Sequence, residues 1–159
     1  MIDKSIAVLP ALSPWIESLS TEYTCGPAAA VTALRTLGLP AEEGEIAILA
    51  HTSSLTGTEP DILAKVLQER YRPNGLLTEY RAFKDLEELK SAGLTVAILK
   101  FNALQDHCVT IFGVQSNGID IADPLTGLNI VPRREFENKW RFVGIVFKRA
   151  DWQLQRPTK

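Results

Sequence analysis

Apolar residues in the first half of the chain recur with the spacing of amphipathic helices. The clearest case is the stretch 27–37, whose apolar positions predict a helix with one face against a core. Pro27 suits the first turn of this helix, and Gly38 suits the position just after its end. Two further helices are predicted, over 42–50 and over about 59–70.

The second half of the chain has the pattern of β-strands, with short apolar runs separated by turn residues. Strands are predicted over 76–83, 94–101, 107–114, 119–123, 129–131 and 142–148. Short helices are predicted over 84–92 and 133–140. The pair Asn117-Gly118 is the strongest hairpin signal in the chain. Helices followed by neighbouring strands predict an α+β fold, with N-terminal helices packed on a C-terminal antiparallel sheet.

Length and composition indicate one globular domain. The 159 residues suit a single core, and we expect a domain over 1–150 followed by a polar tail over 151–159. Hydrophobic residues make up 45% of the chain and charged residues 23%, as in an ordinary globular domain. A net charge of −2 argues against a nucleic-acid partner. The apolar runs are far shorter than the ~20 residues of a membrane-spanning helix, so we expect no span and a cytoplasmic protein. The oligomeric state is left open.

Cys25 carries the strongest chemical signal in the sequence. It lies in Tyr23-Thr24-Cys25-Gly26-Pro27, directly before the first predicted helix. The positive end of a helix dipole lowers the pKa of a thiol at this position, and the thiolate is the nucleophilic form. Gly26 leaves room for a substrate backbone beside the sulfur. The alternative interpretation is a small buried residue at a helix start, since free cysteines are usually buried.

One histidine and one aspartate extend this observation into a catalytic hypothesis. His107 opens a predicted strand, and Asp123 follows 16 residues later in Ala122-Asp123-Pro124. In a Cys-His-Asp triad, His107 would deprotonate Cys25 and later protonate the leaving amine, while Asp123 would fix the tautomer of the imidazole. Taken singly, His107 also fits a surface histidine and Asp123 a turn initiator.

The predicted hairpin conflicts with this triad. A two-residue turn at Asn117-Gly118 would place Asp123 opposite Phe112, about 16 Å along the strand from His107 at the usual rise of a β-strand. We therefore expect a wider loop, a bulge or a strong bend between these two strands.

The other cysteine and histidine are assigned no catalytic role. Cys108 follows His107 on a strand, so its side chain points to the opposite face, and we expect it to pack in the core. His51 lies near a predicted helix end, where contact with the helix C-terminus is a sufficient explanation. Two cysteines are too few for a disulfide framework or a cysteine-only zinc site. A metal site formed by Cys25, His107, Cys108 and Asp123 is poorly motivated, because the strand turns two of these ligands apart. We expect no metal and no cofactor.

Three blocks of the sequence resemble peptidase family C39, the papain-like peptidase domains of bacteriocin-processing exporters. They are Thr24-Cys25-Gly26-Pro27-Ala28-Ala29 with the helix that follows, the strand over 107–114, and Ile121-Ala122-Asp123-Pro124 with Thr126-Gly127 and 136–140. The resemblance covers roughly residues 20–148. It implies a papain-like cysteine peptidase fold and a Cys25-His107-Asp123 triad that cleaves a peptide bond through a thioester acyl-enzyme.

One position departs from the family pattern. The family usually has a glutamine six residues before the cysteine as an oxyanion-hole donor, and here that residue is Leu19. Leucine donates no hydrogen bond, and the loss of one such donor slows a serine protease about 10²–10³-fold. Ser18, Ser20 or Thr21 is the predicted substitute, together with the backbone N–H of Cys25. The predicted substrate-binding residues are Ser20, Thr21 and Gly26.

The leading hypothesis is therefore a thiol peptidase with a peptide or protein substrate, and the resemblance implies a Gly-Gly leader peptide. The same thioester chemistry is also compatible with acyl transfer to an amine instead of water. A third hypothesis is a non-catalytic peptide-binding domain, which Leu19 favours and the joint presence of Cys25, His107 and Asp123 disfavours. Because the chain has the length of one peptidase domain, we expect a stand-alone relative of the exporters, without the transporter.

Overall fold

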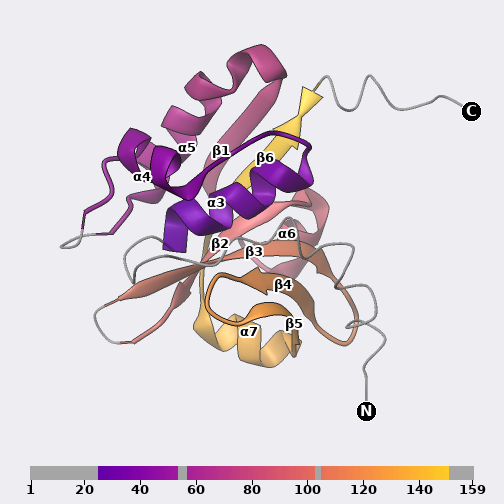
Figure 1. Cartoon of the computed structure of the whole chain (residues 1–159). Helices are drawn as coiled ribbons and strands as arrows, with labels where there is room; N and C mark the ends of the chain where they lie inside the picture. The colour runs from indigo at the N-terminus through magenta and orange to yellow at the C-terminus, as the bar shows by residue number, and fades with distance from the viewer. Residues whose placement is uncertain (1–24, 54–56, 103–104, 151–159) are drawn as a thin grey trace, which may run out of the picture.

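The computed structural model describes residues 25–53, 57–102 and 105–150 (Figure 1). Three helices come first: α3 (Cys25–Thr36), α4 (Glu43–Leu49) and α5 (Pro60–Arg70), followed by the short 3-10 helix η2 (Arg72–Asn74). The strands are β1 (Leu76–Ala82), β2 (Thr95–Lys100), β3 (Asp106–Val114), β4 (Ile119–Asp123), β5 (Gly127–Val131) and β6 (Trp140–Arg149). Helix α6 (Leu86–Ala92) lies between β1 and β2, and α7 (Arg133–Lys139) lies between β5 and β6. The predicted helices and strands are confirmed to within about two residues, whereas η2 was not predicted. The predicted tail over 151–159 lies outside the described residues.

The described strands form one six-stranded sheet in the order β1-β6-β2-β3-β4-β5, and each neighbouring pair is antiparallel. Helices α3, α4 and α5 lie together on one side of this sheet, and α7 lies on the other side (Figure 1). The predicted α+β class, with N-terminal helices packed on an antiparallel sheet, is confirmed. In the described part of the chain, no helix is long and apolar enough to cross a membrane.

Two apolar clusters hold the helices on the two faces of the sheet. The first cluster joins α3, α4 and α5 to one face through side chains such as Leu34, Ile46 and Leu67. The second joins α6 and α7 to the other face, where Phe136 and Trp140 are among its buried members. Burial of this much apolar surface is the main force that holds such layers together.

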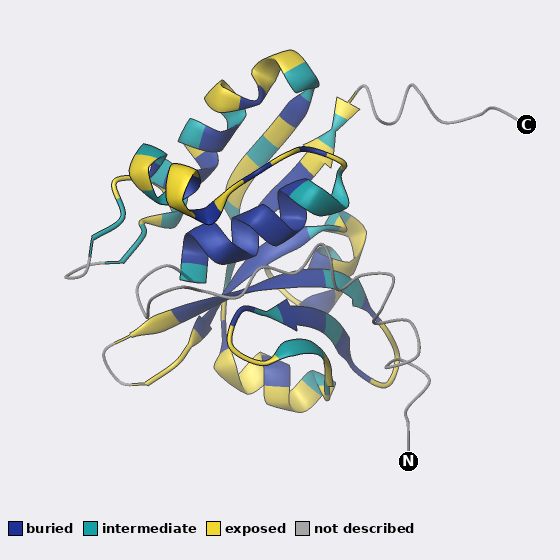
Figure 2. Ribbon diagram, in the orientation of Figure 1, coloured by how far each residue is buried: buried dark blue, intermediate teal, exposed yellow. Residues whose placement is uncertain are grey.

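Helix α3 is the central helix of the fold. Every residue from Gly26 to Leu34 is buried, as the dark blue helix in Figure 2 shows. Its alanines favour a helix and keep its surface small, so it packs closely against the sheet. The helix ends in a Schellman motif: Gly38 adopts φ +80°, and the N–H of Leu39 donates to the carbonyl of Leu34 at 2.9 Å.

Candidate active site

Helix α3 begins at Cys25, which places this thiol at the positive end of the helix dipole. The neighbouring Gly26 allows close packing at this point. A Cβ atom on Gly26 would lie 3.1 Å from Cβ of Thr58 and 3.5 Å from Cδ2 of Leu63. The space left by the missing side chain is therefore filled by α5 and the loop before it. A contact between the Gly26 backbone and a substrate stays a prediction.

The structure brings His107 and Asp123 together. Nε2 of His107 lies 2.6 Å from Oδ1 of Asp123, and both side chains are largely shielded from solvent. The same carboxylate oxygen accepts a 2.8 Å hydrogen bond from the N–H of Leu125. Asp123 thus begins a turn and also orients the imidazole, so the turn interpretation and the catalytic interpretation of Asp-Pro are compatible. The ring of Phe101 lies 5.5 Å from the imidazole, centroid to centroid.

A β-bulge allows this contact between His107 and Asp123. Val114 pairs with Ile119 and Gly113 with Asp120, but the next pair is Ile111 with Ile121, so Phe112 is an extra residue in β3. Continued without the bulge, the first register would set Asp123 opposite Thr110, on the face of the sheet away from His107. With the bulge, the register of the Thr110–Ala122 pair, continued by one residue, sets Asp123 opposite Val109, on the face of the sheet that His107 occupies.

The connection between β3 and β4 is also wider than a two-residue turn. Residues 115–118 form the loop, and the N–H of Gln115 donates to the carbonyl of Gly118 at 2.8 Å. The predicted tight turn at Asn117-Gly118 is wrong. Of the expected alternatives, a wider loop, a bulge or a strong bend, the structure has the first two.

Cys25 contacts two neighbouring residues of β3. Its sulfur is hydrogen-bonded to the imidazole of His107, and it accepts hydrogen bonds from the thiol and the backbone N–H of Cys108. Since Nε2 of His107 is bonded to Asp123, Nδ1 is the ring nitrogen left for Cys25. Pairing between β3 and β4 ends at Thr110 and Ala122. Residues 106–109 of β3 therefore form no pairs with β4.

Cys108 is the neighbour of Cys25 that sequence reasoning missed. As predicted, it is buried and lies on the opposite face of β3 from His107. Helix α3 packs on that face, so Cys108 meets the sulfur of Cys25 instead of serving only as an apolar core residue. The only sequence signal for this contact was that Cys108 directly follows His107. Strand alternation alone predicted no partner for the Cys108 thiol.

The pKa values of Cys25 and His107 shift in opposite directions. The hydrogen bond from Cys108 contributes most to lowering the pKa of Cys25 to about 5; burial opposes this shift, and His107 reinforces it. Burial is the largest effect on His107 and lowers its pKa, but the contacts with Asp123 and Cys25 together outweigh it and raise the pKa to about 9. Between these values the arrangement favours a thiolate–imidazolium pair, whose two protonation steps are coupled.

The remaining predicted residues do not join this site or lie outside the described residues. Ser20, Thr21 and Leu19 precede the first described residue, so their predicted roles stay predictions. His51 follows α4 with φ +55°, and its N–H donates to the carbonyl of Ile48, which is typical of a residue that ends a helix. Among the described residues, no group of three or more His, Cys, Asp or Glu side chains is placed to hold a metal ion.

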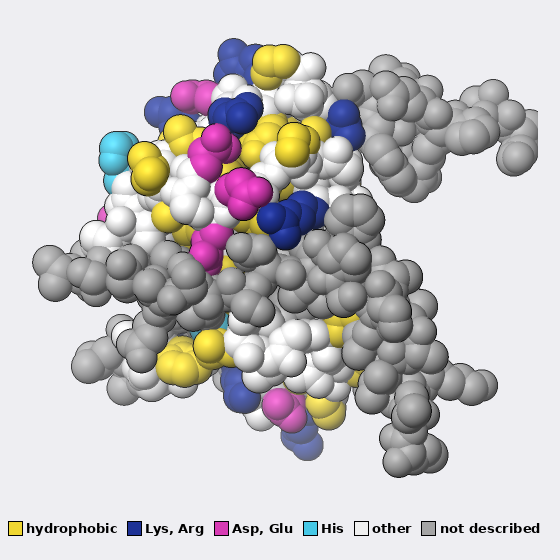
Figure 3. Space-filling view, in the orientation of Figure 1, with side chains coloured by type: hydrophobic (Ala, Val, Ile, Leu, Met, Phe, Trp, Pro, Cys, Tyr) yellow, Lys and Arg dark blue, Asp and Glu magenta, His cyan; other side chains and the backbone are white. Residues whose placement is uncertain are grey.

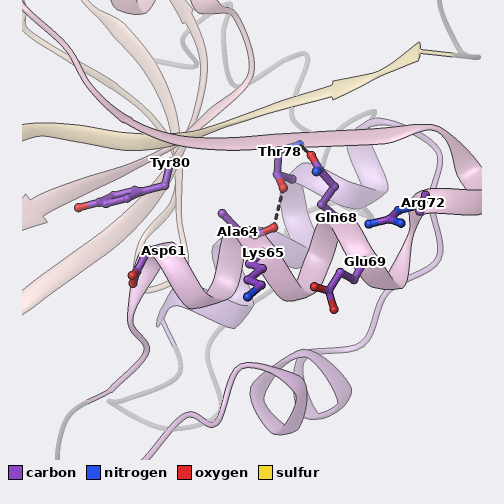
Figure 4. A pocket seen from close by; sticks show the side chains of 8 residues that line it. All are labelled: Asp61, Ala64, Lys65, Gln68, Glu69, Arg72, Thr78 and Tyr80. Carbon is purple, nitrogen blue, oxygen red and sulfur yellow. Dashed lines mark hydrogen bonds between the residues drawn. The ribbon is translucent and has the colours of Figure 1, made fainter.

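A second surface feature is a groove of about 380 Å³ between α5 and β1. Asp61 and Tyr80 lie at one end, and Glu69 and Arg72 at the other (Figure 4). None of Cys25, His107 and Asp123 lines it. Basic and acidic side chains are interspersed on the face of the molecule shown in Figure 3.

Comparison with known proteins agrees with this geometry. The model of the peptidase C39 family matches residues 16–151. The chain belongs to the peptidase C39 family. A C39 peptidase fold is also found in the solved structure of a double glycine motif protease from an AMS/PCAT transporter in complex with the leader peptide. The TM-score is 0.71 at 20% identity, over 84% of this chain and 90% of that one.

Two further proteins are similar to this C39 chain. The peptidase domain of Streptococcus ComA, a bifunctional ABC transporter involved in quorum sensing, gives a TM-score of 0.71 at 19% identity, over 84% of this chain and 96% of that one. An uncharacterized protein of Methanothermobacter thermautotrophicus is 29% identical over 117 residues, which are 74% of this chain and 76% of the relative. The papain-like C39 fold expected from the sequence is confirmed.

Proposed function

We propose that this C39 protein is a cysteine peptidase in which Cys25 is the nucleophile, His107 the acid and base, and Asp123 the residue that orients His107. One observation carries the proposal: a continuous chain of hydrogen bonds runs from the Cys25 sulfur through the imidazole of His107 to the Asp123 carboxylate. The three residues come from three different elements, α3, β3 and the end of β4.

In the first half of the proposed reaction, the Cys25 thiolate attacks the carbonyl carbon of the scissile peptide bond. The C–N bond breaks as the His107 imidazolium gives its proton to the leaving amine, and a thioester remains on Cys25. The low pKa of Cys25 supplies the thiolate before substrate binds. The raised pKa of His107 keeps the proton on the imidazole until the amine needs it.

In the second half, neutral His107 takes a proton from water, and the resulting hydroxide attacks the thioester. The C–S bond breaks, the carboxylic acid product leaves, and the thiolate and imidazolium are restored. Asp123 holds Nε2 of His107 throughout, so Nδ1 stays directed toward Cys25 and the reacting atoms.

The start of α3 supplies one donor for the tetrahedral oxyanion. The backbone N–H of Cys25 is at the first position of the helix, where an N–H has no acceptor within the helix. A second donor is assigned to Ser20 or Thr21, because Leu19 has no hydrogen-bonding group in its side chain. This departure at Leu19 is the one specific observation that favours a peptide-binding domain without catalysis.

The proposed substrate is a peptide. The transporter protease with the same fold was solved with a leader peptide bound and acts at a double glycine motif, so a Gly-Gly leader sequence is the first candidate substrate. A degenerate peptide library tests other sequences in the same assay.

The test is mass spectrometry of peptides incubated with the wild-type protein and with Cys25→Ala. Cleavage by the wild type alone, with products that gain water, supports the proposal. Products joined to an added amine would assign the protein to acyl transfer instead. Peptide binding without any cleavage in the library would contradict the proposal and favour a binding domain.

A further inference from the structure

The two cysteines of the chain are side by side and both are free. Cys25 packs against the apolar cluster that contains Cys108, and the Cys108 thiol donates a hydrogen bond to the Cys25 sulfur. The mechanism proposed above uses Cys25 as the nucleophile and gives Cys108 no covalent step.

The packing of α3 on β3 fixes this juxtaposition. One helical turn after Cys25, the carbonyl of Ala29 accepts a 2.8 Å hydrogen bond from the hydroxyl of Thr110. Thr110 is two residues after Cys108, on the same face of the strand. A helical turn of about 5.4 Å nearly matches a two-residue strand step of about 6.6 Å. The contact between Ala29 and Thr110 therefore brings Cys25 and Cys108 into register.

The environments of the two sulfurs differ in a way that suits a sequential reaction. Cys25 is half-buried and carries the lowered pKa, so it is the sulfur that meets a small oxidant as a thiolate. Cys108 is buried, and its pKa is raised well above the usual value, chiefly by its hydrogen bond to Cys25 and then by burial. It is therefore held as a thiol next to the reactive sulfur.

We propose that Cys25 and Cys108 form a redox pair, in which a hydroperoxide oxidises Cys25 and Cys108 captures the product as an intramolecular disulfide. In the first step, the Cys25 thiolate attacks the outer oxygen of the hydroperoxide. The O–O bond breaks, the alcohol or water leaves with one proton, and Cys25 becomes a sulfenic acid. In the second step, the Cys108 sulfur attacks the Cys25 sulfur, the S–O bond breaks, and water leaves with the proton of Cys108.

Oxidation of Cys25 itself makes Cys108 more reactive. The leading cause of the raised pKa of Cys108 is its hydrogen bond to the Cys25 thiolate, together with the negative charge of that thiolate. A sulfenic acid is neutral, so the effect of the charge is removed and the hydrogen bond is no longer made to a thiolate, while burial and Asp106 continue to raise this pKa. The capturing thiol is thus activated only after Cys25 has been oxidised.

The disulfide would remove the nucleophile and also protect it, because further oxidation of a sulfenic acid to sulfinic acid is irreversible in the absence of a dedicated repair enzyme. A dithiol would restore both thiols. Control of activity by this pair rests on the proposed peptidase function, whereas formation of the disulfide does not.

The test uses the full-length reduced protein treated with an equimolar amount of hydrogen peroxide. We expect intact-mass analysis to show a monomer lighter by about 2 Da, with both thiols lost to alkylation and both recovered with dithiothreitol. Peptide mapping should find Cys25 linked to Cys108. A disulfide between two chains, or direct conversion of wild-type Cys25 to sulfinic acid, would overturn the proposal.

Two variants sharpen the result. In Cys108→Ala treated with excess peroxide, Cys25 should react with a first peroxide to give the sulfenic acid and with a second to give a sulfinic acid that dithiothreitol does not reverse. In Cys25→Ala, Cys108 should resist the same treatment, because it stays buried and burial still raises its pKa. Equal rates of irreversible Cys25 oxidation in wild type and Cys108→Ala would exclude capture by Cys108. Since mass and thiol counts are the readouts, a protein that cleaves no peptide can still pass or fail this test.

Discussion

The imidazole of His107 and the carboxylate of Asp123 are joined by a 2.6 Å hydrogen bond that depends on one extra residue, Phe112, in β3. The bulge shifts the register by one position, which brings Asp123 to the face of the sheet that His107 occupies. The same carboxylate is fixed from its other side by the N–H of Leu125. Asp123 is therefore held by the backbone before any substrate binds, and it holds His107 in turn.

Replacing Asp123 by asparagine should lower the pKa of His107 from about 9, because the charged partner and acceptor of the imidazolium is lost while burial remains. Because the His107 imidazolium then loses its proton at a lower pH, the alkaline limit of peptide cleavage should also move to lower pH. We also expect kcat/KM to fall about 10²–10⁴-fold, the usual contribution of acid–base catalysis.

NMR titration of His107 measures this pKa directly. Asp120→Asn is the matched control, because Asp120 is on the same strand and bonds to Gln115 instead of His107. If the titration of His107 is the same in Asp123→Asn and in wild type, Asp123 does not orient or stabilise the imidazolium.

Replacing Thr110 by valine tests how α3 is held against the sheet. The buried hydroxyl of Thr110 donates to the carbonyl of Ala29 at 2.8 Å, and its loss should lower the free energy of unfolding by about 1 kcal/mol. The start of α3 should also shift relative to β3, so alkylation of Cys25 should slow.

Thr78→Val is the matched control for this prediction. The hydroxyl of Thr78 makes the equivalent strand-to-helix bond, to the carbonyl of Ala64 at 2.6 Å, where β1 meets α5 (Figure 4). Urea unfolding should show a comparable loss of stability in both variants, with slower alkylation only in Thr110→Val. Equal alkylation rates in the two variants would argue that the contact between Thr110 and Ala29 does not position Cys25.

Gly26→Ala should destabilise the fold relative to Gly44→Ala by about 1–3 kcal/mol, the usual cost of overpacking. A Cβ on Gly26 would lie 3.1 Å and 3.3 Å from two side-chain atoms of Thr58, whereas a Cβ on Gly44 would have no neighbour within 4 Å. Both glycines are in helices, so the comparison cancels most of the difference in helix propensity. Equal free energies of unfolding for the two variants would show that Gly26 is not needed for packing against Thr58.

Replacing Cys108 by alanine should raise the pKa of Cys25, because the hydrogen bond from Cys108 contributes most to its lowering. The pH dependence of Cys25 alkylation should move to higher pH in Cys108→Ala. It should move back in Cys108→Ser, whose hydroxyl also donates a hydrogen bond. A side chain that only fills space would leave the profile of Cys108→Ala unchanged.

Local patterns were sufficient to predict the helices and strands, because periodicity and turn residues report on which faces are buried. They were not sufficient at Asn117-Gly118, a pair that fits a two-residue turn but lies in a four-residue loop, 115–118. The register here is set by the burial of Ile111 and Ile121 on one face, and the bulge at Phe112 accommodates it. The conflict between the turn and the triad was visible in the sequence, but its resolution required the tertiary structure.

At the candidate site, too, local patterns predicted some features and others depended on the tertiary structure. Strand alternation correctly placed Cys108 on the face opposite His107. That a helix packs there, and that its first residue is Cys25, depends on how α3 packs on the sheet, which no local pattern encodes. The partnership of the two thiols was therefore missed, while His107 and Asp123 were selected from their residue types, order and spacing.

The central claim is that Cys25 is a thiolate paired with His107, and the pH dependence of its alkylation by iodoacetamide tests this claim most directly. The pKa of Cys25 is lowered to about 5 by Cys108 and His107, so alkylation should rise as the pH increases through about 5. It should be near its plateau at neutral pH and change again as His107 loses its proton near pH 9. In His107→Ala, the first rise should move to higher pH. A single rise near the pKa of an ordinary thiol, unchanged in His107→Ala, would contradict the account.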